Sequence, residues 1–236
     1  HMINLYNIDC MEAMKKAPDN QLIGYTSALP NRINWENMFR IYPHWRFMLS
    51  PQSLKSFGKS REPLLYKQGF AIDNGAYGYY KANKEFDENA FMKLVDTYGH
   101  KADFVVIPDF VGNWKKTIDY YHHWEKYLLG FNTLLVAQDG FSYKDAAAII
   151  GPKTGIFLGG TSEFKIKNMI PIGELCKKYG CYYHIGRVNS VKRIRLCSLA
   201  LAHSFDGSGS SRFLRTSTLL SESLSNINNQ YNLFGE

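Results

Sequence analysis

Short apolar runs alternate along the chain with longer segments of helical pattern. The runs are rich in β-branched and aromatic residues, and most of them end in a polar residue or a glycine. Continuous apolar runs separated by helices are typical of repeated βα units, so the pattern predicts a parallel sheet. The eight predicted strands are 22–27, 46–50, 70–73, 103–108, 133–138, 155–159, 182–186 and 203–206.

Helices are predicted between these strands, where apolar residues recur at helical spacing, as Phe91, Leu94 and Val95 do. Asn113 is a suitable N-cap for one of them. The clearest predicted helices are 87–98, 114–129 and 189–202. Eight strands, each followed by a turn or helix, predict an α/β fold of the (β/α)8 TIM-like barrel type. Because the early units are the least regular, an open sheet with fewer strands is the alternative.

The length of 236 residues, with 45% hydrophobic and 15% aromatic residues, suits one large core and is too short for two α/β domains. We therefore expect one domain over residues 1–236, with a loosely held polar tail from about Ser221. No apolar run is long enough for a membrane span, and no segment resembles a signal peptide. The expected location is the cytoplasm of a bacterium or a phage-infected host, with no membrane partner.

The formal net charge is +7, with 28 basic against 21 acidic residues, so the long-range field favours an anionic partner. Nucleic acid is the first candidate and a phosphorylated metabolite the second. The four cysteines form no CxxC pair and no metal-like spacing with histidine, so we expect buried free thiols and neither a metal nor a cofactor. These cysteines are Cys10, Cys176, Cys181 and Cys197.

Polar residues gather where the predicted strands end, and barrel enzymes build their sites at this edge. Asp73, Asp109 and Asp206 each end or follow an apolar strand, so a closed barrel would bring the three carboxylates together. At the rim of an apolar cavity a carboxylate can be tuned as acid, base or nucleophile. The alternative is that aspartate and glycine after a strand are ordinary turn formers.

The order of these strand ends resembles the tRNA-guanine transglycosylase superfamily over residues 22–215. Segment 73–78 (DNGAYG) is similar to the family's Asp-Ser-Gly-Gly-Phe/Tyr-Gln segment, and Asp109 after FVVIP matches its base-recognising acid. Gln138 in LVAQDG resembles its Val-Gln-Gly-Gly, and 158–160 (LGG) resembles its Gly-Gly-Leu turn. Gly186 falls at its Gly-rich turn, and Phe205-Asp206 matches the Phe-Asp that carries its nucleophile.

The resemblance points to the DNA-acting branch, the 7-deazaguanine DNA transglycosylases of phages and bacteria. The family's tRNA enzymes carry a Cys-x-Cys-x2-Cys…His zinc segment after the nucleophile, and no cysteine follows Cys197 here. The family's second glycine is Ala76, its glutamine is Gly78, and Asp139 displaces a glycine after Gln138. Residues 207–212 replace its Pro-Thr-Arg.

The resemblance implies that Asp206 attacks the sugar C1′ and forms a covalent intermediate, while Asp73 is the general acid and base. Asp109 would accept hydrogen bonds from N1–H and the exocyclic amine of a guanine-like base, and Tyr77 would stack on it. The other predicted base-binding residues are Asn74, Gln138, Gly159, Gly160, His184 and Gly186. The implied partners are DNA with a flipped or single-stranded target, guanine and a 7-deazapurine such as preQ0 or preQ1, with a helper protein or homodimer as a further expectation.

Basic residues flank the predicted nucleophile and could hold the phosphates of the strand. They are Arg187, Lys192, Arg193, Arg195, Arg212 and Arg215. For Lys192, Arg193 and Arg195 the alternative is a solvated helix face. Three other functions stay open at this stage: a tRNA-acting transglycosylase, a non-catalytic nucleic-acid-binding barrel, and a barrel enzyme that binds a phosphorylated metabolite at its glycine turns.

Overall fold

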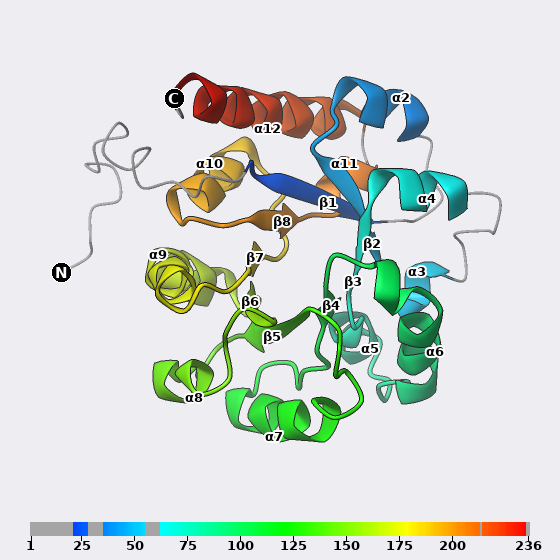
Figure 1. Cartoon of the computed structure of the whole chain (residues 1–236), viewed down its shortest axis with the longest axis vertical. Helices are drawn as coiled ribbons and strands as arrows, with labels where there is room; N and C mark the ends of the chain where they lie inside the picture. The colour runs from blue at the N-terminus through cyan, green and yellow to red at the C-terminus, as the bar shows by residue number, and fades with distance from the viewer. Residues whose placement is uncertain (1–20, 28–34, 55–61, 213, 235–236) are drawn as a thin grey trace.

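The computed structural model describes residues 21–27, 35–54, 62–212 and 214–234. Its eight strands pair in parallel, in sequence order, and β8 closes on β1, which confirms the predicted (β/α)8 barrel (Figure 1). The strands are β1 Ile23–Ser27, β2 Trp45–Leu49, β3 Phe70–Ile72, β4 Val105–Val106, β5 Thr133–Ala137, β6 Thr154–Leu158, β7 Tyr183–Ile185 and β8 Ser204–Asp206. All eight overlap the strands predicted from the apolar runs.

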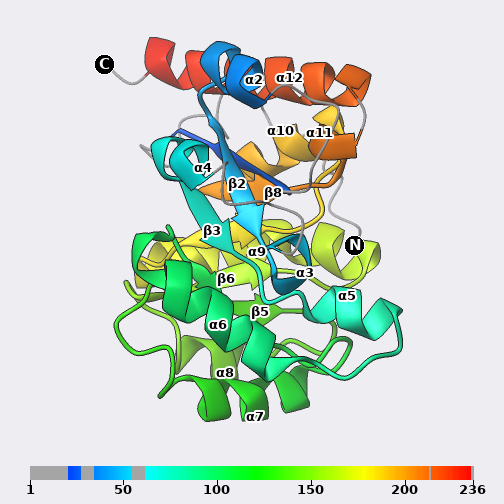
Figure 2. The same ribbon diagram turned by 90° about the vertical axis from the view of Figure 1, so that its right-hand side faces the viewer.

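Helices surround the strands on all sides (Figures 1 and 2). They are α2 Trp35–Ile41, α3 Pro51–Leu54, α4 Glu62–Gln68, α5 Ala76–Lys81, α6 Glu88–Tyr98, α7 Trp114–Trp124, α8 Tyr143–Ala147, α9 Ser162–Tyr179, α10 Val191–Leu199, α11 Gly209–Arg212 and α12 Leu214–Phe234, with a 3-10 turn η2 at Gly99–Lys101. The side chains of Asp87, Asn113 and Ser190 cap α6, α7 and α10, which confirms that the three predicted helices exist. Two of them are shorter than predicted, because α7 ends at Trp124 and α10 at Leu199.

Two apolar layers result from the alternation of side chains along the strands. One layer fills the space between strands and helices and includes Trp45 and Phe47, both fully buried. The other fills the barrel, where the rings of Tyr25 on β1 and Phe104 before β4 meet at 5.3 Å although their strands are not neighbours. The interior is therefore a packed core, and a reactive site is confined to its ends.

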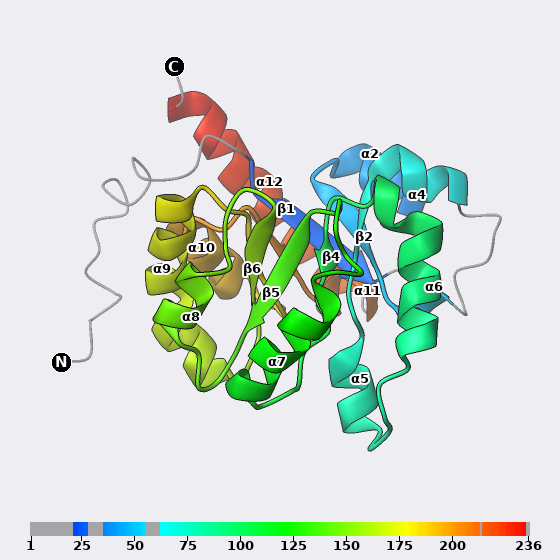
Figure 3. The same ribbon diagram turned by 60° about the horizontal axis from the view of Figure 1, so that its bottom comes forward.

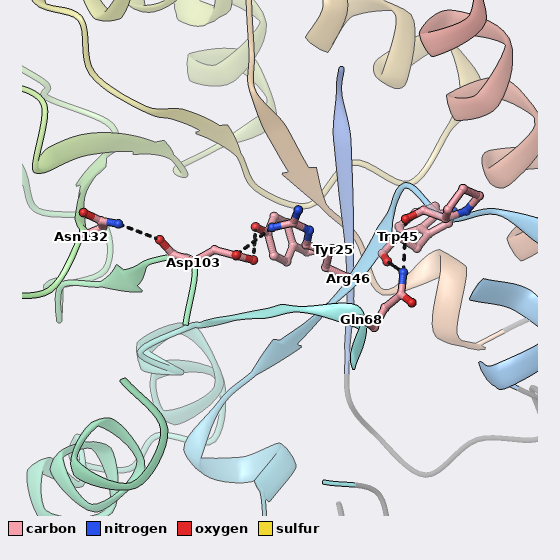
Figure 4. A network of polar contacts seen from close by, with 7 residues as sticks. Tyr25, Trp45, Arg46, Gln68, Asp103 and Asn132 are labelled. Carbon is pink, nitrogen blue, oxygen red and sulfur yellow. Dashed lines mark hydrogen bonds and ion pairs between the residues drawn. The ribbon is translucent and has the colours of Figure 1, made fainter. Parts of the chain in front are cut away.

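A polar network lies at the amino-terminal end of the barrel (Figure 4). The Tyr25 hydroxyl donates to Asp103 Oδ2 at 2.8 Å, and Arg46 Nη1 contacts Asp103 Oδ1 at 2.7 Å. Asn132 Nδ2 donates to the Asp103 backbone carbonyl at 3.3 Å. Because these partners satisfy the carboxylate, Asp103 serves to tie β1, β2 and β4 together at this end.

The predicted loose tail from Ser221 is wrong, because this stretch lies within α12, which packs against α10 and α11 (Figure 1). Leu220 and Leu224 are buried, and the Trp45 indole N–H donates to the buried Ser221 hydroxyl at 2.9 Å. The side chain of Asn228 bonds both the N–H and the carbonyl of Leu22. The composition misled because small polar side chains here satisfy buried backbone groups across a helix interface.

Three cysteines, Cys176, Cys181 and Cys197, are buried free thiols, as predicted, and Cys10 lies outside the described residues. Within the described segments, no helix combines the length and the apolar character needed to cross a membrane.

Candidate active site

Three carboxylates from different strands share the carboxyl-terminal end of the barrel. Asp73 follows β3, Asp109 follows β4 by three residues, and Asp206 is the last residue of β8. Asp109 and Asp206 both act electrostatically on Asp73 and raise its pKa, which places the three groups in one site. The convergence follows from the fold, because all parallel strands of a closed barrel end on the same face.

Asp73 is the most strongly perturbed of the three. Burial of the carboxyl, with the added repulsion of Asp206 and Asp109, raises its pKa to about 7, although the backbone N–H groups of Gly75 and Asn74 act in the opposite direction. At neutral pH the group is thus divided between its acid and its base forms. This is the state that a general acid and base requires.

A fully buried histidine contacts the carboxylate of Asp206. His184 Nε2 lies 3.1 Å from Asp206 Oδ1, while its Nδ1 lies 2.7 Å from the Ser204 hydroxyl. The backbone N–H of Arg187 also donates to Asp206 Oδ1, at 3.3 Å. Within the described residues both contacts fall on Oδ1, so they fix the orientation of the carboxylate. His184 therefore orients the carboxylate, and its contact with a base stays a prediction.

Asp109 is fixed by two amides that the sequence assigned to substrate binding. Asn74 Nδ2 donates to Asp109 Oδ1 at 3.0 Å and to the Ile107 carbonyl at 2.8 Å. Gln138 Nε2 lies 3.4 Å from Asp109 Oδ2 and donates to the Thr117 hydroxyl at 2.6 Å. Burial raises the pKa of Asp109 to about 6, and these amides oppose the shift. Asn74 and Gln138 are buried and hold Asp109 in place.

Lys165 belongs to the site and was missed in the sequence. It lies on α9 with 6% of its surface exposed, and its ammonium donates to the Gly186 carbonyl at 2.7 Å. Burial lowers its pKa to about 8, with Asp206 acting in the opposite direction. The sequence did hold a signal: Lys165 lies four residues before Met169 and seven before Ile172, so helical spacing places it on the same buried face.

A contact between Tyr77 and Arg187 crosses the mouth of the barrel. Tyr77 lies on α5 after β3 and Arg187 follows β7, and these two strands are opposite one another in the closed ring. The guanidinium lies 4.5 Å from the ring centroid, and Arg187 has a left-handed backbone with φ of 61°. Figure 3 shows α5 at the lower edge of the molecule, below α6.

The turn that follows β6 contains Gly159 and Gly160 and has a defined conformation. Gly160 has φ of 76°, and a side chain there would meet Asp139 Oδ2 at 2.7 Å. Asp139 instead accepts from the Thr161 N–H and hydroxyl, at 2.8 and 2.7 Å. Gly159 and Gly160 are thereby placed at the same end of the barrel as the carboxylates.

The predicted basic rim is only partly built around the carboxylates. Arg187, Lys192 and Arg193 line one cavity together with Gly186, whereas Arg195 and Arg215 are exposed on α10 and α12. Arg212 falls within α11, and its side chain lies outside the described residues. In the described part of the chain no group of three or more His, Cys, Asp or Glu residues is arranged to hold a metal ion.

The raised pKa of Asp73 predicts that Asp73→Asn stabilises the fold above pH 7. The unfolded carboxyl releases its proton near its ordinary value of 3.8, and the folded one near 7, so native stability falls as pH rises between these values. Removing the charge should raise the free energy of unfolding by about 2 kcal/mol at pH 8, within an upper limit of about 4 kcal/mol. Thermal unfolding at pH 8 and pH 4 measures it, with Asp96→Asn on α6 as the control. An equal gain at both pH values would contradict it.

Comparison with known proteins defines the class of fold. No family model matches the sequence, and no curated protein matches it. Methylaspartate ammonia lyase from Citrobacter amalonaticus is similar in structure, with a TM-score of 0.57 and 14% identity over 96% of this chain and 62% of that chain. β-Methylaspartase from Clostridium tetanomorphum has a TM-score of 0.53 and 13% identity over 92% and 62%.

Tryptophan synthase from M. tuberculosis is also similar, with a TM-score of 0.50 and 9% identity over 92% of this chain and 97% of that chain. The chain spans 62% of the length of the two methylaspartate lyases. At these identities the similarity shows the fold alone. The protein is a TIM-barrel protein.

Proposed function

We propose that the protein is a DNA guanine transglycosylase, which exchanges guanine in DNA for a 7-deazaguanine base such as preQ0. The observation that carries the proposal is the pair formed by Asp73 and Asp206 at one end of the barrel. Double displacement at a glycosidic carbon needs one carboxyl that holds a proton and a second that is oriented to attack. The raised pKa of Asp73 and the contacts of His184 and Arg187 to Asp206 support these two roles.

In the first half of the reaction, the Asp206 carboxylate attacks C1′ of the target deoxyguanosine. The bond from C1′ to N9 breaks, the bonding pair leaves with guanine, and Asp73 donates its proton to the leaving base. In the second half, Asp73 takes the N9 proton of the incoming 7-deazaguanine. Its N9 then attacks C1′, and the bond from C1′ to Asp206 breaks. Asp73 and Asp206 both return to their starting states, so no oxidant or cofactor is consumed.

Base recognition is assigned to Asp109. An ionised carboxylate accepts hydrogen bonds from N1–H and the exocyclic amine of guanine, a donor pair that adenine does not present. Asn74 and Gln138 orient the two oxygens, and the backbone of Gly159 and Gly160 lies at the same face for the opposite edge of the base. Tyr77 is 42% exposed and supplies a stacking surface once Arg187 moves off it.

The test is release of labelled guanine from DNA in the presence of preQ0. Wild-type protein should release guanine over many turnovers only when an acceptor base is supplied, with at most one guanine per enzyme released without it, and tRNA offered in parallel should release none. Preference for tRNA would instead indicate a tRNA-acting transglycosylase. No release from single-stranded or duplex DNA with guanine, preQ0 or preQ1 as acceptor would overturn the proposal and favour a binding barrel.

A prediction on specificity follows from the position of Asp109. Asp109→Ala removes the acceptor for N1–H and the amine, so the thermal shift produced by guanine or preQ0 should be lost, with affinity reduced at least about tenfold. Adenine should bind neither protein. Differential scanning fluorimetry with the three bases measures this, and Asp119→Ala on the exposed face of α7 is the matched control. Unchanged guanine binding in Asp109→Ala would remove Asp109 from the recognition site.

A further inference from the structure

A cavity of about 180 Å³ lies between α9 and α10, beside the mouth of the barrel. It shares Gly186 and Arg187 with the carboxylate site, and the Arg187 N–H contacts Asp206. No step of the proposed reaction uses this cavity.

The lining is strongly basic. It contains Lys165, Arg187, Lys192 and Arg193, and no aspartate or glutamate is among the lining residues. Arg187 and Arg193 each repel the buried Lys165 ammonium, whereas Asp206, which is not among the lining residues, attracts it. Like charges gathered around a cavity are unfavourable unless an anion neutralises them.

Arg193 is placed to bridge the two helices across the cavity. Its guanidinium donates to the Arg187 carbonyl at 3.4 Å and to the Ser162 hydroxyl at 3.3 Å. Both partners are neutral and both bonds are long for a guanidinium. A phosphate oxygen would be a stronger acceptor for the Arg193 guanidinium. In addition, Ser162 is the first residue of α9, and the amino-terminal end of a helix favours negative charge.

The rest of the wall is apolar. Ile166, Met169 and Leu196 line the cavity away from the cations, and Ile166 is 49% exposed at its rim. An inorganic anion alone would leave this wall uncovered. The chemistry of the cavity therefore fits a phosphoryl group that is joined to a less polar part, as in a nucleotide.

We infer that this cavity binds the phosphate and the adjoining sugar of the nucleotide next to the target in the DNA strand. The inference rests on the proposed function, because it places the flanking phosphate next to Arg187 while C1′ of the target faces Asp206. A free phosphorylated metabolite shares the same chemistry, so the experiment has to separate the two sources.

The test measures binding of a fluorescently labelled single-stranded oligonucleotide by anisotropy at several salt concentrations. Arg193→Ala should weaken binding about tenfold and reduce the slope of log K against log salt by about 0.7 to 1, the loss of one phosphate contact. Lys167→Ala removes an exposed charge from the same helix outside the cavity and should change binding far less. Equal effects of the two variants would overturn the inference.

A second pair of variants tests the cavity without removing a cation. Ile166→Glu places a negative charge at the rim, whereas Ile166→Gln adds a side chain of similar size without charge. Because Ile166 is half-exposed, both proteins should fold, and circular dichroism checks this. The glutamate should weaken oligonucleotide binding several-fold more than the glutamine. Equal binding by the two would place the strand elsewhere.

Competition by inorganic phosphate and by deoxyguanosine monophosphate separates the two sources. If inorganic phosphate and deoxyguanosine monophosphate both compete only weakly with the oligonucleotide, and Arg193→Ala abolishes this competition, the result supports a site for the DNA strand. Tight, Arg193-dependent binding of the monophosphate with no effect of Arg193→Ala on the oligonucleotide overturns it in favour of a small phosphorylated ligand. Guanine release is scored separately with wild-type protein. Its absence overturns the proposed function, while normal release with unchanged binding in Arg193→Ala overturns only this inference.

Discussion

Asp206→Asn should abolish guanine release from DNA, with a loss of at least about 10⁴-fold in rate. The amide keeps the shape of the side chain but cannot form the covalent bond to C1′, and loss of a nucleophile costs about this much or more in enzymes that use one. The rate of labelled guanine release with preQ0 measures the effect. Guanine binding should persist, because recognition is assigned to Asp109.

The controls for Asp206→Asn separate chemistry from folding. Asp119→Asn changes an exposed aspartate on α7 and should keep the wild-type rate. Wild-type protein mixed with DNA in the absence of an acceptor base should yield a protein–DNA adduct that survives denaturation, and Asp206→Asn should yield none. A variant that retains full activity, or an adduct located on another residue, would sink the assignment of Asp206 as the nucleophile.

Asp73→Asn is expected to have the second largest effect, a loss of about 10² to 10⁴ in rate, which is the usual contribution of a general acid and base. Asp73 must hold a proton when guanine leaves, so activity should fall as pH rises through about 7. Asp109 must be ionised to accept from the base, so activity should also fall as pH drops through about 6. The kcat/KM of the wild-type protein should therefore follow a narrow bell.

In Asp73→Asn the residual activity should lose the fall above pH 7 and keep the fall below pH 6. Asp109→Asn is the complementary variant and should lose the acid limb instead. Full pH profiles of the three proteins, with folding checked at each extreme, distinguish the two carboxyls. An alkaline limb that survives in Asp73→Asn would assign the proton to another group, and Lys165, whose pKa is lowered to about 8, is the next candidate.

Asp73→Asn is thus expected to have two opposite effects, since it should stabilise the fold and impair the reaction. Burial near Asp109 and Asp206 makes ionised Asp73 costly, and this cost is what keeps a proton available at neutral pH. Under the proposed function, the buried carboxyl that serves the reaction is therefore also one that lowers the stability of the native state.

Much of the barrel could be predicted because its signals are local. An apolar run such as 133–138, buried on both faces, has the length and composition of a parallel strand wherever it occurs. Once eight such strands were recognised, the convergence of Asp73, Asp109 and Asp206 followed from topology alone. The tail from Ser221 was misjudged because its serines and asparagines are polar by composition, and only their partners in the folded chain show that they pack.

By itself the sequence determined the class of fold, the strand that carries each candidate carboxylate, and the excess of positive charge. The tertiary structure decided what each side chain contacts. It placed His184 beneath Asp206, turned Asn74 and Gln138 toward Asp109, and buried Lys165 between α9 and the turn at Gly186. These contacts join residues that are distant in the chain, and their strength depends on burial and separation in space. Local spacing carries no information on either quantity, which is why the roles of these residues emerged only from the folded barrel.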